Sequence, residues 1–345
     1  MKVIEKKIAT DFGDVTLVRV VNSRGACVEF SSLGAGIVAA EVSDRDGVLA
    51  NVCLGYASPQ DYMADGPCMG KVPGRYANRI AGGRLEVEGK HYQLAVNCGP
   101  NALHGGPTGF QNRIWDVETL PDGVRFSRLS PDGEENYPGN LKVTAEYRWS
   151  EDNVLTLRLH AETDAPTVVN LTSHAYWNLR GASAGSALDH ELTLSASHYL
   201  ATDDTLVPQG APAPVEGTPM DFRSAKPLGR DIKADFPALR QGKGYDACWV
   251  LDGTPGLYLA DAVVLHCPAS GRTLRIGSDQ PGVQVYTGNW LAGSPLSSAG
   301  TPFSDYDGVA IEMQGFPDAP NRPDFPSQSL RPGESYDRVI TFAFS

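Results

Sequence analysis

An alternation of apolar and polar residues with a period of two constrains this chain more than any other feature of its sequence. Every second side chain is apolar or aromatic over residues 141–149, and the same pattern returns over 155–161. A strand with one buried face has this period, because successive side chains of an extended chain point to opposite sides. The polar residues 150–153 separate the two runs. We therefore predict one antiparallel hairpin with a four-residue turn over 141–161.

Strand-like patterns and turns continue along the chain, which contains 37 Gly and 25 Pro residues. A second, shorter hairpin is predicted from Leu85–Val87 and Tyr92–Val96 around a turn at Glu88–Lys90. Helical periodicity nowhere persists for the roughly 10 to 12 residues that would indicate a full helix, but 58–64 and 231–240 could each hold a short helix. Other strand-like runs occur at 14–21, 191–196, 282–287, 308–313 and 338–344. Without intervening helices these strands cannot form parallel βαβ units, so we predict an all-β fold, either an antiparallel sandwich or an open barrel.

The length of 345 residues is compatible with two domains at about 150 residues each, or with one large all-β domain. The proline-rich stretch 208–219 is the best linker candidate, but strand-like pattern continues on both sides, and a long surface loop explains it equally well. Neither a change in composition nor a repeat of fixed period divides the chain. We expect a single domain over residues 1–345.

The composition argues against several classes of partner. The formal net charge is -12, and no basic cluster is present, whereas nucleic acids and anionic membranes require local positive charge. The longest apolar stretches are far shorter than the roughly 20 residues that cross a bilayer, and the N-terminal residues turn polar before a signal peptide could form. We expect a cytoplasmic protein with a small neutral partner. The six cysteines occur singly, which predicts buried free thiols rather than a zinc site or disulfides.

Two segments carry polar groups that turns and strands do not require, and such groups on loops are candidates for function. Residues 74–80 place Asn78 and Arg79 among small residues, with amide and guanidinium donors that suit hydroxyl oxygens. Residues 101–106 contain His104 followed by two glycines, which permit a tight backbone and close approach of a ligand. Each pattern also occurs in ordinary surface turns.

Two further segments suggest chemistry. Residues 168–179 embed His174 among Asn, Thr, Ser, Tyr and Trp, a mixture that suits a sugar, because aromatic rings stack on pyranose C–H faces while polar groups bond the hydroxyls. A structural, hydrogen-bonded His would give the same pattern. Residues 308–316 form a mostly apolar strand with Glu312 at its centre, which is costly unless the carboxylate is partnered, used or exposed on an edge strand. A carboxylate, two imidazoles and an Arg together suit proton transfer.

The motifs, taken in order, resemble those of the aldose 1-epimerases, or galactose mutarotases, over essentially the whole chain. They are Gly-Arg-Tyr-Ala-Asn-Arg-Ile at 74–80, Leu-His-Gly-Gly at 103–106, Val-Asn-Leu-Thr-Ser-His at 169–174, Gly-Tyr-Asp at 244–246, Pro-Gly-Val-Gln-Val-Tyr-Thr-Gly at 281–288 and Ile-Glu-Met-Gln-Gly-Phe-Pro-Asp-Ala-Pro-Asn at 311–321. The resemblance implies a large antiparallel β-sandwich with few short helices and a sugar site in a cleft on one sheet. It also implies an isomerase that interconverts the α and β anomers of free aldoses such as galactose and glucose.

The same resemblance implies catalytic roles. The carboxylate that matches Glu312 is the base that takes the proton from the C1 hydroxyl, and the imidazole that matches His174 is the acid that protonates the ring oxygen O5. The imidazole that matches His104 bonds near O5 and stabilises developing charge. No cofactor is implied, because only protons move within one molecule.

Binding roles follow from the resemblance in the same way. Asn78, Arg79 and Asp246 are expected to hold sugar hydroxyls, and Gln284 is expected to help order the site. Arg79 would also help to keep a nearby carboxylate ionised. One departure is Ala247, where many relatives have His; it leaves the sugar preference open. The oligomeric state is expected to be a monomer or a homodimer.

Other functions fit parts of the sequence. The letters G-x-S-x-G at 181–185 suggest a serine hydrolase, but no strand–turn–helix context surrounds them, and we predict a loop. A glycoside hydrolase would use Glu312 and Asp246 as its two carboxylates. A phosphosugar isomerase would need more cationic groups than Arg75 and Arg79. A non-catalytic sugar-binding or sugar-sensing protein on the same fold is the main alternative.

Overall fold

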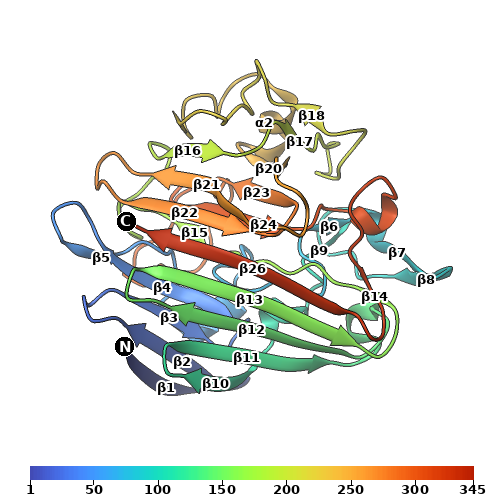
Figure 1. Cartoon of the computed structure of the whole chain (residues 1–345), viewed down its shortest axis with the longest axis horizontal. Coiled ribbons are helices and arrows are strands. Elements are labelled where there is room, and N and C mark those ends of the chain that lie inside the picture. The colour runs from blue at the N-terminus through green and yellow to red at the C-terminus, as the bar shows by residue number, and fades with distance from the viewer.

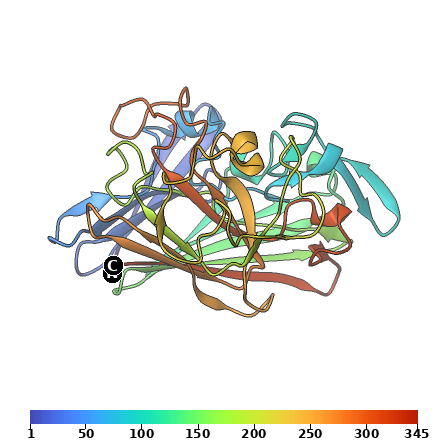
Figure 2. The ribbon, with the colours of Figure 1, turned by 90° about the horizontal axis from the view of Figure 1, so that it is seen from above.

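The computed structural model describes residues 1–345 and is built mainly from antiparallel strands (Figure 1). Its largest sheet has nine strands and occupies one side of the molecule, while α2 and most of the loops lie on the other side (Figure 2). In spatial order these strands are β10 (Asp116–Leu120), β11 (Gly123–Ser130), β12 (Leu141–Trp149), β13 (Val154–Thr163), β26 (Ser335–Phe344), β22 (Thr273–Ser278), β21 (Leu259–His266), β16 (Glu191–Leu194) and β19 (Lys226–Pro227).

Two smaller sheets and three strand pairs complete the fold. The six-stranded sheet has the order β15 (Tyr176–Trp177), β24 (Val309–Gln314), β23 (Gly282–Tyr286), β20 (Asp246–Val250), β17 (His198–Tyr199) and β18 (Ala213–Pro214). The five-stranded sheet contains β1 (Lys2–Thr10), β2 (Gly13–Val21), β3 (Cys27–Ser31), β4 (Gly36–Ser43) and β5 (Leu49–Asn51). The pairs are β6 (Arg79–Ile80) with β9 (Ala102–Leu103), β7 (Arg84–Val87) with β8 (Lys90–Gln93), and β14 (Thr167–Val168) with β25 (Ser329–Leu330).

The structure confirms the predicted all-β class and the long hairpin, in which β12 and β13 pair from Leu141 opposite Thr163 to Trp149 opposite Leu155. The second hairpin is shorter than predicted. Its turn contains only Glu88 and Gly89, both at positive φ (49° and 77°), the backbone that a tight two-residue hairpin turn requires. Strand β8 therefore begins at Lys90, and it ends at Gln93 rather than at residue 96.

Only two short α-helices form. Helix α1 (Pro59–Met63) lies within the predicted range 58–64. Helix α2 (Pro237–Gly242) covers only the last part of 231–240 and extends beyond it. The reason is Pro237 at the first helical turn, which cannot donate a backbone hydrogen bond and therefore favours a helix start at that residue. Single 3₁₀ turns occur at Ala81–Gly83, Phe110–Asn112, Glu134–Asn136 and Ala319–Asn321.

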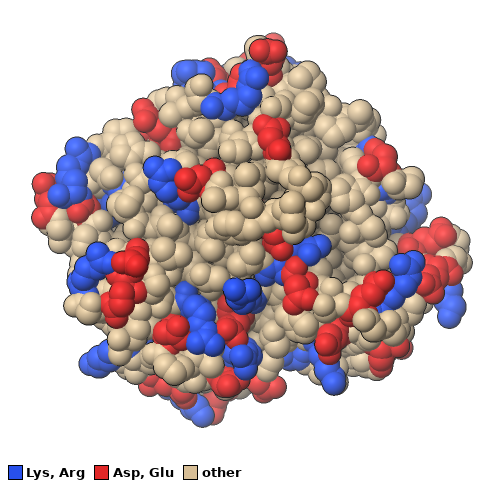
Figure 3. Space-filling model, in the orientation of Figure 1, with Lys and Arg blue, Asp and Glu red and all other residues tan.

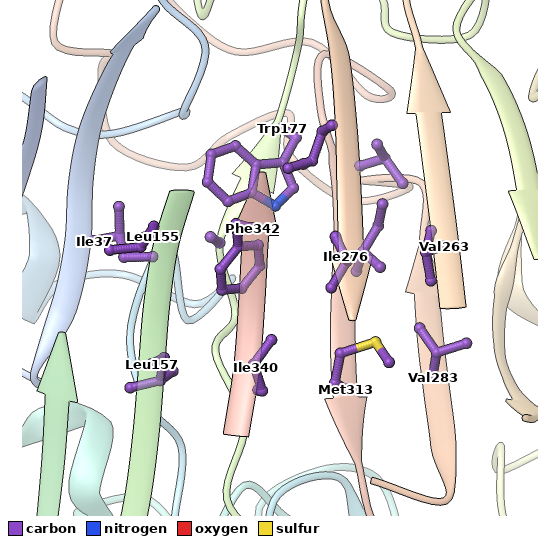
Figure 4. Close-up of a cluster of buried hydrophobic side chains, with 14 of the residues drawn as sticks. Ile37, Leu155, Leu157, Trp177, Val263, Ile276, Val283, Met313, Ile340 and Phe342 are labelled. Carbon is purple, nitrogen blue, oxygen red and sulfur yellow. The ribbon is translucent and has the colours of Figure 1, made fainter. Parts of the chain in front are cut away.

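The main apolar core lies between the sheets and contains 61 buried residues from Val18 to Phe344. Figure 4 shows Val283 of β23 and Met313 of β24 beside residues of the nine-stranded sheet such as Ile340. Because strands alternate, the intervening side chains of β23 and β24 must face away from this core. A continuous core of this kind is compatible with the single domain that we predict over residues 1–345.

Two predictions from the composition, free buried thiols and the absence of a cationic surface, can be compared with the structure. All six cysteines are free, and five of them are buried. Blue and red groups are interspersed over the face drawn in Figure 3. This face therefore offers no extended cationic surface. No helix of the chain is both long and apolar enough to span a bilayer.

The core predicts how stability responds to truncation. Leu157 of β13 is fully buried in the main cluster, so Leu157→Ala should lower the free energy of unfolding by about 2–5 kcal/mol, measured by urea denaturation. Leu129→Ala in β11 is the matched control, because Leu129 is 56% exposed and its loss should stay within about 0.5 kcal/mol. Equal losses at the two positions would contradict this description of the core.

Candidate active site

A pocket of about 260 Å³ beside the six-stranded sheet contains all the site residues predicted from the sequence. It is lined by Gly66, Pro67, Asn78, Arg79, Cys98, Leu103, His104, His174, Tyr176, Leu206, Asp246, Gln284, Tyr286, Trp290 and Glu312. A larger surface hollow of about 550 Å³ lies beside the β7–β8 hairpin, but none of its lining side chains has a buried polar atom without a partner. The smaller pocket is therefore the better candidate for a polar ligand.

The register of the sheet brings the reactive groups together. Gln284 of β23 lies directly opposite Glu312 of β24. On the other side of β24, Tyr176 lies opposite Ala310, and His174 comes two residues before Tyr176 in the chain. Side chains opposite one another in neighbouring strands have Cβ atoms about 5 Å apart. Strand pairing thus sets the amide of Gln284 beside Glu312, whereas the backbone of His174, just before β15, is held by hydrogen bonds to residues 70 and 71.

Glu312 and His174 form the centre of the pocket. Atom Oε1 of Glu312 lies 3.5 Å from Nε2 of His174, and their side chains are only 2% and 6% exposed. Atom Oε2 of Glu312 and Nδ1 of His174 are buried without a hydrogen-bond partner in the protein. Strand β24 is internal to its sheet, between β15 and β23, so the alternative of an exposed Glu on an edge strand is wrong. A buried, unpaired carboxylate oxygen in a pocket is available to a hydroxyl group of a ligand.

A second polar group surrounds Asp246. Its Oδ1 accepts a hydrogen bond from Nε2 of Gln284 at 2.5 Å, and its Oδ2 lies 3.8 Å from Nη2 of Arg79. Gln284 and Arg79 each retain one buried polar atom without a protein partner, Oε1 and Nε respectively. This cluster therefore combines a fixed carboxylate with an unpaired acceptor and an unpaired donor, which suits a ligand with several hydroxyl groups.

His104 is held by the short pairing of β6 with β9. The backbone N–H of Asn78 donates to Nδ1 of His104 at 3.1 Å, and the backbone N–H of His104 donates to the carbonyl of Asn78 at 3.1 Å. Because Nδ1 accepts a hydrogen bond, a neutral His104 carries its proton on Nε2 and is a donor there. Its ring lies 5.2 Å from that of His174, edge to face.

The two glycines after His104 are required by close contacts with neighbouring segments of the protein. A Cβ atom on Gly105 would lie 1.9 Å from the carbonyl oxygen of Gly74, and one on Gly106 would lie 2.3 Å from Oε2 of Glu135. These glycines therefore make room for neighbouring protein segments, and their φ values of 78° and 98° confirm the predicted tight backbone, while neither glycine lines the pocket. Asn78 itself adopts a positive φ of 66°, and its side chain accepts a hydrogen bond from the backbone N–H of Arg79 at 2.8 Å.

Burial determines the protonation of the site. It raises the pKa of Glu312 well above its usual value; the charge of Asp246 adds to this rise and that of Arg79 opposes it. Burial, with a further contribution from the positive charge of Lys71, lowers the pKa of His174 to about 4. Burial, His174 and Arg79 lower the pKa of His104 well below its usual value. At neutral pH both imidazoles are therefore uncharged, and burial favours the protonated form of Glu312.

Several lining residues were not assigned from the sequence. Tyr286 lies two residues after Gln284 in β23, and strand alternation could have identified it. Trp290 is 64% exposed at the pocket and lies in a loop, where no periodic pattern marks it. Tyr176 was noted only as part of a polar segment; its ring lies 5.0 Å from that of His174. Leu206 comes from a loop distant in sequence.

Three residues singled out from the sequence lie outside the pocket. Arg75 is buried and bonds to Ser130 and to the carbonyls of Pro131 and Pro138, so it adds no charge to the pocket. Ala247 belongs to the main core, on the opposite face of β20 from Asp246, and it does not line the pocket. Ser183 lies in the loop between β15 and β16 with no helix after it, as predicted.

Comparisons with known proteins give a consistent result. The chain matches the aldose 1-epimerase family over residues 16–343. It is 44% identical over 318 residues to the galactose mutarotase of Homo sapiens, which covers 92% of this chain and 91% of that protein. It is 36% identical over 343 residues to the aldose 1-epimerase of Escherichia coli K12, and the alignment covers 98% of this chain and 97% of that protein.

Solved structures agree with the sequence comparisons. The fold is similar to that of an aldose epimerase homologue from C. elegans, with a TM-score of 0.87, 30% identity and 99% of each chain covered. It is also similar to a galactose 1-epimerase from Lactobacillus acidophilus, with a TM-score of 0.86 and 28% identity over 100% of this chain and 98% of that one.

The protonation of the site can be measured directly. In ¹⁵N-histidine-labelled protein, the ring nitrogens of His174 should report a neutral imidazole throughout the neutral range and titrate near pH 4, because burial disfavours its charged form. His91, whose side chain is 82% exposed, provides an internal comparison in the same spectra, and a His174→Asn variant assigns the signal. Titration of His174 near pH 6.5 would contradict the electrostatics described above.

Proposed function

Because the chain belongs to the aldose 1-epimerase family and is an isomerase that interconverts the α and β anomers of free aldoses, we propose that its pocket opens and recloses the sugar ring by general acid–base catalysis. The observation that carries this proposal is the contact of 3.5 Å between the buried carboxylate of Glu312 and the buried imidazole of His174. A base and an acid held side by side are what the cleavage of a cyclic hemiacetal requires.

The proposed reaction transfers two protons in each direction. Glu312 takes the proton from the C1 hydroxyl while His174 delivers a proton to O5, and the C1–O5 bond breaks to give the open-chain aldehyde. Rotation about C1–C2 presents the other face of the carbonyl to the C5 hydroxyl. In the reverse step His174 takes the C5 hydroxyl proton and Glu312 returns its proton to O1, so the enzyme regains its initial state. The Nε2–H of His104 supports charge that develops near O5.

Burial favours this direction of proton transfer. The reactive form has an ionised Glu312 and a protonated His174, and it contains the same number of protons as the uncharged pair. After ring opening the proton resides on Glu312 and His174 is neutral, which is the arrangement that burial favours. The buried ion pair is therefore the less stable arrangement, and because the uncharged pair is also the resting state, the energy released on discharge offsets the cost of forming the ion pair.

Substrate binding is assigned to the remaining polar residues. We assign Asn78, Arg79 and Asp246 to sugar hydroxyls, with Gln284 ordering Asp246 through its hydrogen bond of 2.5 Å. Arg79 lowers the pKa of Glu312, which supports the expectation that it helps to ionise a nearby carboxylate. Tyr286 and Trp290 provide aromatic faces on the pocket wall, which suit the C–H faces of a pyranose.

Other features of the site disfavour the rival functions. Asp246 is engaged by Gln284 and Arg79, which does not suit the second carboxylate of a glycoside hydrolase that must act on a glycosidic bond. Arg79 is the only Lys or Arg among the pocket residues, so a sugar phosphate would lack the expected cations. We also propose a cytoplasmic location, in keeping with six free cysteines, and a monomeric or homodimeric state.

The decisive test is Glu312→Gln, which keeps the shape of the side chain but removes the base. The rate of mutarotation of freshly dissolved α-D-galactose and α-D-glucose, followed by polarimetry, should fall about 10²- to 10⁴-fold, while sugar affinity measured by calorimetry stays within a few fold. Glu162→Gln is the control, because Glu162 is 62% exposed on the nine-stranded sheet. Loss of affinity in proportion to turnover would refute the general-base assignment.

The shared proton also predicts the pH profile. The value of kcat/KM should be constant through the neutral range, because the pair then holds one proton. It should fall below about pH 4, where a second proton occupies His174 and no base remains. It should fall again at high pH, where the last proton leaves Glu312, whose pKa is raised. After subtraction of the uncatalysed rate, an acid limb centred near pH 6.5 would contradict this assignment.

A further inference from the structure

A buried ion pair behind the active site has no role in the mechanism above. Atom Nζ of Lys71 lies 3.2 Å from Oδ2 of Asp65, and the two side chains are 1% and 0% exposed. Burying two charges costs several kcal/mol per ion before their attraction is counted, and such pairs commonly add no stability over an apolar packing. A purpose other than stability is therefore worth seeking.

The ion pair fixes the segment 64–71, which forms one wall of the pocket through Gly66 and Pro67. Asp65 accepts hydrogen bonds from the Tyr56 hydroxyl and from the backbone N–H of Met69, both at 2.7 Å. Lys71 donates to the carbonyl of Tyr62 and, at 3.3 Å, to Oδ1 of Asn112. Asp65 thus joins one end of the segment to Tyr56, and Lys71 joins the other end to helix α1 and to Asn112.

This same segment holds the proposed catalytic acid on two sides. The backbone N–H of His174 donates to the carbonyl of Lys71, and the N–H of Gly70 donates to the carbonyl of His174, both at 2.9 Å. The hydroxyl of Tyr176 donates to the carbonyl of Pro67 at 3.0 Å, and the Tyr176 ring lies 5.0 Å from the imidazole of His174. The backbone of His174 and the aromatic ring against its imidazole are both anchored to segment 64–71.

We propose that the Asp65–Lys71 ion pair is a positioning unit for His174, which holds its backbone and its neighbouring ring in place for proton transfer to the sugar. The inference rests on the proposed role of His174 in the reaction. Lys71 touches neither Glu312 nor the pocket, so its effect on catalysis is transmitted through His174. Its positive charge also lowers the pKa of His174, which links the same residue to the proton affinity of the acid.

Other charged and titratable groups surround the imidazole and must be considered together with Lys71. Glu312 of β24 lies against Nε2, His104 contacts the ring edge and Tyr176 its face. Arg79 and Asp246 act on His174 indirectly, because their charges shift the pKa of Glu312. None of these groups is itself substituted in the variants below, so a change in the titration of His174 follows from the loss of the ion pair and of the anchoring that it provides.

The test is the double variant Asp65→Asn/Lys71→Met, which removes both charges and leaves neither one buried alone. We expect kcat for galactose to fall about tenfold or more and KM to change by less than about threefold, with the pKa of His174, followed by ¹⁵N NMR, shifted upward because the ammonium charge is gone. Unchanged kcat together with an unchanged His174 titration would overturn the proposal.

A matched control separates positioning from general loss of stability. Lys226 and Asp231 form another buried lysine pair, with Nζ and Oδ2 2.8 Å apart and Lys226 only 2% exposed, yet neither residue lines the pocket. Asp231→Asn/Lys226→Met should lower the melting temperature without moving the His174 signals. If both double variants shift the His174 titration equally, the positioning role is refuted.

A conservative variant covers the case in which the double variant does not fold. Lys71→Arg keeps the charge but presents a planar group that cannot reproduce the contacts of Nζ. We expect a lower kcat with KM retained, and a His174 titration still near its original value; kcat equal to that of the unaltered enzyme would overturn the proposal. The Glu312→Gln test of the proposed function is independent of these variants. If that test fails while the ion-pair variants still shift the His174 titration, the proposed reaction is wrong and the structural coupling remains.

Discussion

The burial of one carboxylate in the middle of a β-sheet is the constraint on which the rest of this structure depends. Glu312 lies in a strand whose six residues are all buried, where an isolated charge is strongly disfavoured. The carboxylate is compatible with this position because His174 lies beside it, with 3.5 Å between Oε1 and Nε2. The cost of burial is thus converted into a raised proton affinity, which is the property that a base near neutral pH needs.

The two faces of β24 explain why this arrangement is rigid. Ile311 and Met313 belong to the core between the sheets, so the strand can neither rotate nor slip by one residue without exposing them. Glu312 is consequently fixed toward the pocket by side chains that take no part in the reaction. Opposite it, Gln284 is fixed in the same way by Val283 and Val285, which lie in the same core. The packing of the sandwich therefore fixes the carboxylate of the proposed acid–base pair.

The sequence predicts those parts of this arrangement that follow from local pattern. Alternation located β12 and β13 to within two residues, because a long half-buried strand repeats its signal many times. Two-residue strands such as β6 and β9 give no such signal, and they exist only because distant loops meet. The site candidates came from motifs in a known order, since each segment alone also suits a turn or a structural histidine. Lys71 was missed because its burial depends on Asp65 and on Asn112, a residue 41 positions away.

Some pocket residues lie on strands and others on loops, and this difference indicates which of them can be substituted without disturbing the core. Glu312, Gln284 and Asp246 lie on three neighbouring strands of one sheet, and any change in their spacing would disturb the core behind them. Leu206 and Trp290 lie on loops at the pocket, where substitutions leave the core intact. Proton transfer needs a fixed distance between two groups, whereas recognition of one sugar over another needs only a different set of contacts around it. We therefore expect loop substitutions to alter sugar preference first, whereas the sandwich preserves the proposed acid–base pair.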